Sequence, residues 1–584
     1  MGKITLRQAA EWCGGTVEEK YANVVFDGAT NDTRNIKPGQ LFVALQGARD
    51  GHEFIADAMA GGAAAVLCTR MMGDYPAVYV SNTRLALGEI ARRERMRIGM
   101  QVVGVTGSVG KSTTKEMIAQ VLETTFRTAK TPANHNNDIG MPMAILGMPE
   151  DTQVAVVEMG MNHFREMAYL SRIARPDLAV ILNIGTMHME HLGSQEGIRR
   201  AKMEILEGMA PDARVVLNGD DAMLRSLEQQ PAQPILYFGT DDSLNVYATD
   251  ICQDGDTLRF EVHDDGGDSF PVQLHLEGGH YVPDALAAIR VGLAMGVSPS
   301  DIRTGLDSFR NMAGRQEILE INGITFIKDC YNAGPESMEG ALKVLGTKPG
   351  RRVAVLGDML ELGACTPAEH YRVGRLAAAN SDLVYAYGPN ASRVVGGCIT
   401  GGMEEYRAQA FTEMDKIIAT LKRTLAPGDV VLVKGSHGMH MEKILDAFLT
   451  ILPSIISVSE TALRAVPEDY EQASLALGAT HLETVFRVTV PAARSGVATA
   501  IVLGVGRAIG EAMAIIMVAG NVANMPGLFR SVRFLTTAIA SEMSYASVGS
   551  LQRNALFSIG LVLFLFIMLI NVFLNVCIKR KKEA

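Results

Sequence analysis

The chain has 584 residues, of which 48% are hydrophobic and 20% charged, a composition that excludes a disordered protein. Its length corresponds to three or four domains of ordinary size. Seven cysteines without a CxxC pair exclude a zinc ribbon and a disulfide scaffold, so we expect reduced thiols. The net charge of −10 argues against nucleic acid as a partner, because a phosphate backbone requires a basic surface.

The charge is divided unevenly along the chain. Residues 453–584 contain 11 Lys and Arg against 8 Asp and Glu, a net charge of +3, which leaves 43 against 56, or −13, for residues 1–452. An acidic body is therefore followed by an apolar tail with a basic end. The first residues lack the apolar run of a signal peptide, so we expect the body to stay in the cytosol.

Short runs of β-branched and other apolar residues alternate with helical stretches in the body. Such runs are typical of buried parallel strands, and the helices between them predict an α/β fold. The six clearest runs cover residues 102–105, 154–157, 178–182, 215–217, 353–356 and 430–433.

A glycine-rich loop follows the first of these runs and precedes a helix expected to begin near Lys111. The sequence is GVTGSVGKST at 104–113, with Val105 where the common GxxxxGK motif has its first glycine. Backbone N–H groups of such a loop surround phosphate oxygens, Lys111 reaches the terminal phosphates, and Ser112 or Thr113 can hold Mg²⁺. The motif predicts an ATP site made of Gly107, Ser108, Val109, Gly110, Lys111, Ser112 and Thr113.

Further motifs follow this loop in a characteristic order. They are NHNNDIGMP at 134–142, VEMG at 157–160, NIGTMHMEHLGS at 183–194, AKME at 201–204, NGDD at 218–221, GRQE at 314–317, DCYNAGPES at 329–337, GDM at 357–359 and KGS at 434–436. In order and spacing they resemble the Mur ligase family of ATP-dependent amide-forming enzymes. The resemblance covers nearly all of residues 1–450. It implies a UDP-substrate-binding domain (1–100), a central ATP-binding domain (101–312) and a C-terminal Rossmann-like domain (313–450).

The resemblance also implies a reaction. ATP converts a peptide carboxylate of UDP-MurNAc-tripeptide into an acyl phosphate, which the amine of D-Ala-D-Ala attacks. The alternative within the family is the preceding ligase of the pathway, which adds the third amino acid. Whether the tripeptide ends in diaminopimelate or lysine stays open.

The family's site residues can be placed on matching positions of this sequence. The implied catalytic residues are Lys111, His188, Lys202 and Lys434, with Lys202 carbamylated. The implied nucleotide contacts outside the loop are Asn183, Asn218, Arg315 and Asp329, and the implied Mg²⁺ ligands are Ser112, Glu158 and His188. A structural histidine at 188 and an exposed helix lysine at 202 are the alternatives.

Substrate contacts are implied on all three domains. The segments 30–34 and 39–54 resemble a uridine-nucleotide-binding domain, which implies contacts by Asp32, Thr33, Arg34, Asp50 and His52. The other implied substrate contacts are Asn136, Asn137, Tyr331, Asn332 and Ser436. Gly334 stands where the family usually has Asn.

The tail (451–584) is predicted to be an all-α membrane segment with two transmembrane helices. Residues 497–518, apart from Arg507 and Glu511, and residues 556–578 are each apolar and long enough to span a bilayer. Arg507 and Glu511 stand four residues apart and can pair. The basic end at 579–582 places the C-terminus in the cytosol.

The segment from Gln472 to Pro491 resembles the coupling loop of ABC-importer permeases, in particular of phosphate importers. The resemblance implies docking on an ABC ATPase subunit. Three interpretations stay open, since only part of a permease is present. The tail is a transport subunit carrying an ATP-binding body, an anchor that holds a ligase at the inner face of the plasma membrane, or the product of an artefactual joining of two genes.

Overall fold

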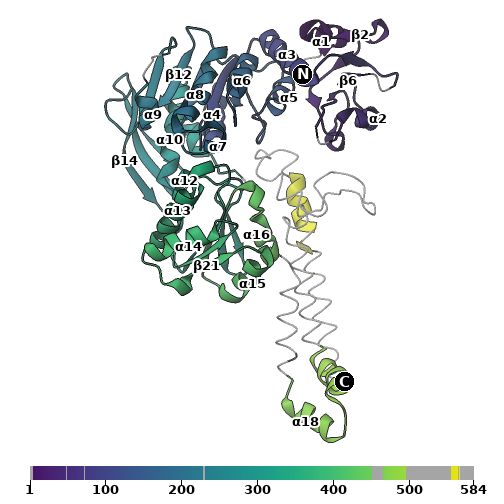
Figure 1. Cartoon of the computed structure of the whole chain (residues 1–584), viewed down its shortest axis with the longest axis vertical. Coiled ribbons are helices and arrows are strands. Elements are labelled where there is room, and N and C mark those ends of the chain that lie inside the picture. The colour runs from purple at the N-terminus through teal and green to yellow at the C-terminus, as the bar shows by residue number, and fades with distance from the viewer. Residues whose placement is uncertain are drawn as a thin grey trace. The chain divides into compact units, whose positions relative to one another are not determined.

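The computed structural model describes residues 4–449 except 48, 71–72, 228–230 and 313, and in the tail residues 463, 466–494, 554–562, 564–565 and 568. The chain divides into two compact units, Met1–Met441 and Glu442–Ala584. Figure 1 shows the α/β character of the first unit, in which strands and helices alternate along the chain. The predicted α/β class of the body is thus confirmed, with three domains that each contain a sheet.

Among the described residues, the middle domain holds a nine-stranded sheet in the order β16-β15-β14-β13-β12-β11-β8-β10-β9. The strands from β14 to β9 in this order are parallel, and β15 and β16 extend the sheet antiparallel. The strands are β8 (Gln101–Thr106), β9 (Thr128–Lys130), β10 (Val154–Glu158), β11 (Leu178–Ile181), β12 (Arg214–Asn218), β13 (Ile235–Gly239), β14 (Val246–Asp254), β15 (Thr257–His263) and β16 (Ser269–Leu274). The helices are α4 (Lys111–Glu123), α5 (Gly140–Leu146), α6 (Glu166–Ala174), α7 (Met189–Leu192), α8 (Gln195–Met203), α9 (Ala222–Arg225), α10 (Val282–Ala294) and α11 (Pro299–Ser308).

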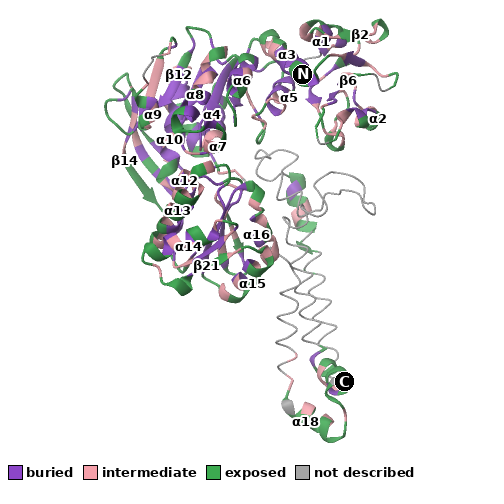
Figure 2. Cartoon of the chain, in the orientation of Figure 1, coloured by how far each residue is buried: buried purple, intermediate pink, exposed green. Residues whose placement is uncertain are grey.

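The central strands of this sheet are buried on both faces. Val154 and Val156 of β10 belong to one apolar cluster, whereas Ala155 and Val157 belong to another. This alternation follows from the two-residue period of a strand. Helices cover both faces, so buried residues concentrate along the strands (Figure 2). The continuous apolar runs of the sequence are explained by this double burial.

The described part of the C-terminal domain has a six-stranded sheet in the order β17-β18-β22-β19-β20-β21. Only the β17–β18 pair is antiparallel. The elements are β17 (Glu317–Ile321), β18 (Ile324–Asp329), β19 (Arg352–Gly357), β20 (Leu383–Tyr387), β21 (Ala408–Phe411), β22 (Val430–Lys434), α12 (Pro335–Gly346), α13 (Thr366–Asn380), α14 (Ala391–Thr400) and α15 (Met414–Thr424). The six predicted parallel strands of the body correspond to β8, β10, β11, β12, β19 and β22, and all six are confirmed.

The N-terminal domain, as far as it is described, contains a five-stranded sheet in the order β2-β7-β6-β5-β4 and a separate β1–β3 pair. Its elements are β1 (Ile4–Thr5), α1 (Leu6–Cys13), β2 (Thr16–Val17), β3 (Val25–Phe26), β4 (Ala29–Thr30), β5 (Leu41–Val43), α2 (Ile55–Ala60), β6 (Ala65–Cys68), β7 (Ala77–Tyr79) and α3 (Thr83–Ile98). Leu6, Leu41 and Leu87 of this domain share one apolar cluster with Val157 and Ile181 of the middle domain. The two domains are therefore joined by a continuous core.

The described regular elements of the second unit are all helical: α16 (Glu442–Leu449), α18 (Glu468–Ala476), α19 (His481–Thr484) and a π-helical turn (Val485–Thr489). Within the described part of the chain, no helix combines the length and apolar character that crossing a bilayer requires. The first predicted span, 497–518, lies outside the described residues, as does most of the second, 556–578. The predicted pair Arg507 and Glu511 also lies outside them. Among the described residues, Cys13, Cys68, Cys252, Cys365 and Cys398 form no disulfide.

Candidate active site

The glycine-rich loop connects the end of β8 to α4, which begins at Lys111 as predicted. Gly110 has a φ of +84°, and a side chain there would also strike Asp284 at 2.5 Å, so both backbone and space require glycine. The Lys111 Nζ donates hydrogen bonds to the carbonyls of Gly107 (2.8 Å) and Ser108 (3.1 Å). The lysine thus lies against its own loop at the start of α4, a position at which helix N-termini bind phosphate.

Asn183, which follows β11, braces this loop. Its side-chain oxygen accepts hydrogen bonds from the N–H groups of Ser108 and Val109, both at 2.9 Å, and its amide donates to the Val109 carbonyl. The Ser108 hydroxyl in turn accepts from the N–H of Gly185. Asn183 was predicted to contact the nucleotide, and the structure places it directly behind the phosphate loop.

Asp284 lies beneath the loop on α10 and is 7% exposed. It accepts a hydrogen bond of 2.8 Å from the Thr114 hydroxyl. Burial raises the pKa of this carboxyl to about 7, although the Thr114 hydrogen bond and the Arg315 charge oppose the shift. Sequence inspection did not single out this carboxyl.

A pH-dependent stability is expected from this raised pKa. Between the ordinary pKa of 3.8 and about 7 the unfolded chain ionises Asp284 while the folded chain keeps it protonated, so the folded state loses stability as pH rises through that window. Asp284→Asn should remove this loss and raise the free energy of unfolding at pH 8 by about 1 kcal/mol or more, since one pKa unit corresponds to about 1.4 kcal/mol. Urea unfolding of both proteins at pH 5 and pH 8 measures it. An equal difference at both pH values would contradict the expectation.

Glu158 ends β10 and is 2% exposed. One carboxylate oxygen accepts a hydrogen bond of 2.9 Å from the Asn136 amide, and the other, Oε2, is buried without a hydrogen-bond partner in the structure. A buried carboxylate oxygen without a donor is costly, so the position suits a cation. Among the described residues, no group of three or more His, Cys, Asp and Glu side chains is arranged to hold a metal. The predicted set of Ser112, Glu158 and His188 contains two such residues.

Lys202 lies on α8 with only 2% of its surface exposed, so the alternative of an exposed helix lysine is wrong. Burial lowers the pKa of its amine well below the ordinary value, and the charge of Lys111 lowers it further. A lowered pKa favours the neutral, nucleophilic form of the amine.

His188 precedes α7 with a left-handed backbone, and its Nδ1 lies 2.6 Å from Oε2 of Glu361 in the C-terminal domain. This hydrogen bond lowers the pKa of the Glu361 carboxyl.

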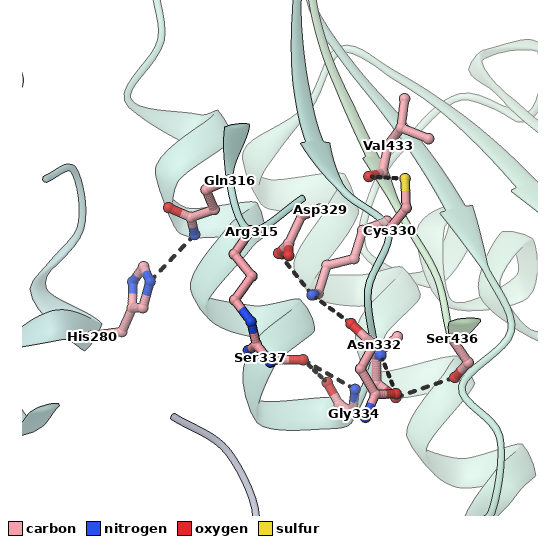
Figure 3. Close-up of polar contacts among 12 residues, drawn as sticks. His280, Arg315, Gln316, Asp329, Cys330, Asn332, Gly334, Ser337, Val433 and Ser436 are labelled. Atoms are coloured by element: carbon pink, nitrogen blue, oxygen red, sulfur yellow. Dashed lines mark hydrogen bonds and ion pairs between the residues drawn. The ribbon is translucent and has the colours of Figure 1, made fainter. Parts of the chain in front are cut away.

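The C-terminal domain contributes a second set of polar residues (Figure 3). The Lys434 amine, 2% exposed, donates to Asp329 at 2.7 Å and to the Asn332 carbonyl at 3.0 Å. Arg315 stacks on the Tyr331 ring at 4.6 Å and donates to the Ser112 hydroxyl at 3.0 Å. The last contact joins this domain to the phosphate loop.

One pocket brings most of the predicted residues together. Its lining includes Ser108, Val109, Gly110, Lys111, Ser112, Thr113, Asn136, Asn137, Glu158, Asn183, His188, Lys202, Asn218, Arg315, Asp329, Tyr331, Asn332 and Lys434. Gly107 directly precedes a lining residue and Ser436 follows Lys434 by two residues, but neither is part of the lining. The Ser436 hydroxyl accepts from the Leu360 N–H and donates to the Ala333 carbonyl. Asn137 caps α5 by accepting from the N–H groups of Ile139 and Gly140.

The predicted residues of the N-terminal domain form a separate group outside this pocket. Asp32 pairs with Arg34 at 2.8 Å, next to Thr33. His52 is 1% exposed, with Nδ1 at 2.6 Å from Asp50 and Nε2 accepting from the Thr69 N–H at 3.0 Å. Because both ring nitrogens of His52 have hydrogen-bond partners within the domain, its side chain supports the segment around Asp50 from inside the domain.

Three functional candidates were missed by the sequence analysis. Glu336 accepts from the N–H and hydroxyl of Thr186, and its Oε2 is buried without a hydrogen bond. Glu361 pairs with His188, and Lys115 is fully buried beside Glu158. Glu336 lies within the DCYNAGPES motif at 329–337, and Lys115 lies one helical turn after Lys111. Their positions relative to these motifs could have indicated both residues.

A glycine-rich loop between a strand and a helix that lines a pocket shared by two α/β domains is typical of a nucleotide-using enzyme. Two family models agree with this class: the Mur ligase middle domain matches residues 105–292, and the Mur ligase, glutamate ligase domain matches residues 314–437. UDP-N-acetylmuramoyl-tripeptide–D-alanyl-D-alanine ligases of Bacillus subtilis and Escherichia coli are 36% and 35% identical, over 76% of this chain and 98% of each relative. The chain therefore belongs to the Mur ligase family.

Solved structures give the same result. Crystal structure I of MurF from Acinetobacter baumannii is similar with a TM-score of 0.70 and 33% identity, covering 77% of this chain and 99% of that one. MurF ligase from Thermotoga maritima in complex with ADP has a TM-score of 0.64 and 30% identity, covering 72% and 97%. The three-domain fold expected from the motifs is confirmed.

The tail matches a different family model. The binding-protein-dependent transport system inner membrane component covers residues 430–583. The resemblance to ABC-importer permeases is thus confirmed, and the chain joins sequences of two families.

Proposed function

We propose that the body of this chain joins D-Ala-D-Ala to UDP-MurNAc-tripeptide in an ATP-dependent ligase reaction of peptidoglycan precursor synthesis. The observation that carries the proposal is the single pocket in which Lys111, Glu158 and Lys202 of the middle domain face Arg315 and Lys434 of the C-terminal domain. The named relatives support it, because this chain covers 98% of their length.

Mg²⁺ fits the proposed site. The Glu158 Oε2 is a buried acceptor without a hydrogen bond, and Ser112 directly follows the phosphate-loop lysine. Ser112, Glu158 and His188 would hold the ion. When bound, Mg²⁺ offsets the negative charge of the phosphates.

The first step joins two anions, the peptide carboxylate and the γ-phosphoryl group of ATP. In our proposal the carboxylate oxygen bonds to the γ-phosphorus while the bond to ADP breaks. Lys111 moves from the Gly107 and Ser108 carbonyls to the phosphates and offsets their charge. Lys202, whose burial lowers the pKa of its amine, is suited to react with CO₂, and the resulting carbamate would be an anion close to Lys111.

In the second step the amine nitrogen bonds to the acyl carbon, and phosphate leaves with the electron pair of the broken C–O bond. Water is the competing nucleophile, so the pocket must stay closed. Contacts between the domains serve this: Arg315 to Ser112, Glu336 to Thr186, and Glu361 to His188. Lys434, held by Asp329, fixes the Asn332 carbonyl on the side of the pocket where D-Ala-D-Ala would bind. Tyr331, which lines the pocket, would complete that side.

The proposed function is tested on the purified full-length chain with ATP and Mg²⁺. Two reactions are compared by product mass and phosphate release: UDP-MurNAc-tripeptide with D-Ala-D-Ala, and UDP-MurNAc-dipeptide with diaminopimelate or lysine. We expect product only in the first reaction. Product only in the second would assign the chain to the preceding ligase. Tripeptides ending in diaminopimelate and in lysine are tested separately.

For the tail we propose anchoring of the ligase at the inner face of the plasma membrane. The match to a membrane transport family supports it, together with the apolar runs at 497–518 and 556–578. Two spans from one chain cannot enclose a polar path, because charged and unpaired backbone groups cannot face lipid.

Docking of the 472–491 segment on an ABC ATPase is the second candidate role of the tail. Helix α18, a turn at Gly478 and helix α19 would form the docking surface.

The anchoring role predicts a clear fractionation result. The full-length chain should sediment with membranes, whereas a fragment ending at Leu452 should stay in the supernatant with similar ligase activity. Neither protein should restore phosphate uptake in cells that lack their own phosphate-importer permease. Immunoblots of membrane fractions and labelled-phosphate uptake measure this. Uptake restored by the full-length chain alone would make the tail a working transporter.

A further inference from the structure

Lys115 is a buried lysine that the reaction scheme does not use. It follows Lys111 by four residues, so it lies one turn further along α4. The side chain is 1% exposed. Lysine is almost never buried so completely unless it is paired, because removing its charge from water is costly.

The partners of Lys115 come from three segments. Its Nζ donates to the carbonyls of Thr131 (2.7 Å) and Ala133 (3.3 Å). It also forms ion pairs with Oε1 of Glu116 at 3.2 Å and with Oε2 of Glu158 at 3.8 Å. The helix that follows the phosphate loop is thereby tied to the segment after β9 and to the end of β10.

The segment held by Lys115 is the loop 131–137. Ala133 has a φ of +42°, in the left-handed region that a residue with a side chain rarely adopts, so this loop needs support from its surroundings. Its start is fixed by the Thr131 hydroxyl, which accepts from the Glu158 N–H at 3.0 Å. The two carbonyls that Lys115 binds flank the point at which the chain turns toward the pocket.

The far part of the loop lines the pocket at Asn134, Asn136 and Asn137. Asn136 donates to Glu158 at 2.9 Å, and its carbonyl accepts from Gly160 at 2.8 Å. Asn134 and Tyr331 of the C-terminal domain line the same pocket. One loop therefore contacts the carboxylate at the end of β10 and contributes to the pocket wall beside the C-terminal domain.

We propose that Lys115 is a positioning residue that fixes the loop 131–137, so that Asn136 holds Glu158 and Asn134 lines the pocket. It contacts no phosphate position itself, because its amine is occupied by the loop carbonyls and Glu116. This inference rests on the proposed function for its effect on turnover, but its effect on the loop does not depend on the substrate.

The test compares Lys115→Met, which keeps the length and removes the charge and donors, with Lys130→Met. Lys130 pairs with the same Glu116 at 2.7 Å but is one-third exposed, which makes it a matched control. Three properties are measured on the full-length chain: hydrogen–deuterium exchange of the 131–137 segment, ADP binding in EDTA, and the Mg²⁺ concentration giving half-maximal ligase activity.

We expect Lys115→Met to exchange faster in the loop and to need about 10- to 100-fold more Mg²⁺, the usual cost of losing a residue that orients a metal ligand. ADP binding in EDTA should be unchanged, and Lys130→Met should match the parent protein throughout.

If Lys115→Met does not fold, Asn136→Ala should reproduce the Mg²⁺ shift. Unchanged exchange and Mg²⁺ dependence, or the same changes in Lys130→Met, would overturn the proposal. Absence of ligase activity in the parent protein would refute the proposed function instead, while loop exchange would still report on Lys115.

Discussion

Replacing Lys111 with Ala is expected to abolish ATP-dependent phosphate release. The variant loses the loop's own cation, which in the free protein is held by the Gly107 and Ser108 carbonyls. Stabilising a transferred phosphoryl group depends on such a charge, so we expect kcat to fall by about 10³-fold or more. A phosphate-release assay with saturating tripeptide and D-Ala-D-Ala measures the loss.

The control is Lys343→Ala on α12, which removes an exposed lysine paired with Glu339. It should retain the activity of the parent protein. Circular dichroism should show that both variants are folded. Parent-like turnover by Lys111→Ala would refute the assignment of the loop.

Replacing Lys202 with Ala should impair ligation severely, and added acetate or formate should restore part of the activity. The reason is the proposed carbamate: a buried amine with a lowered pKa can bind CO₂ and become an anion, which a small carboxylate can replace. Ligation by the variant is measured against carboxylate concentration at fixed Mg²⁺.

Lys202→Arg provides the matched comparison, because arginine keeps a positive charge and forms no carbamate. It should be as impaired as the alanine variant and should not respond to acetate, since its side chain fills the space. Removal of CO₂ should lower the activity of the parent protein alone. Full activity of Lys202→Ala would show that the side chain has no role in the reaction.

Features that depend only on residues close together in the sequence could be predicted from it. The buried strands carry a continuous apolar signal, and the turn at Gly110 needs a positive φ whatever surrounds it. The start of α4 could therefore be predicted near Lys111, where the helix begins. Lys202 was also placed in the site by its motif, although its burial could not be inferred from a polar stretch of helix.

Contacts between distant segments could not be predicted in this way. Glu336 meets Thr186 across 150 residues, and His188 meets Glu361 across 173. No local pattern reports which carboxylate will lie opposite which donor once two domains have folded. His52 shows the same limit, because the partner of its Nε2 is Thr69, which follows β6 and lies 17 residues away in the sequence.

The contacts between the middle and C-terminal domains also bear on the timing of the reaction cycle. Both the phosphate loop and the segment 185–190 are hydrogen-bonded to the C-terminal domain, through Ser112 and through Thr186 and His188. If spent nucleotide leaves between the two domains, several of these bonds must break first. Opening of the two domains would then set the pace of turnover, and solvent viscosity should slow the enzyme even when the bond-making steps are fast.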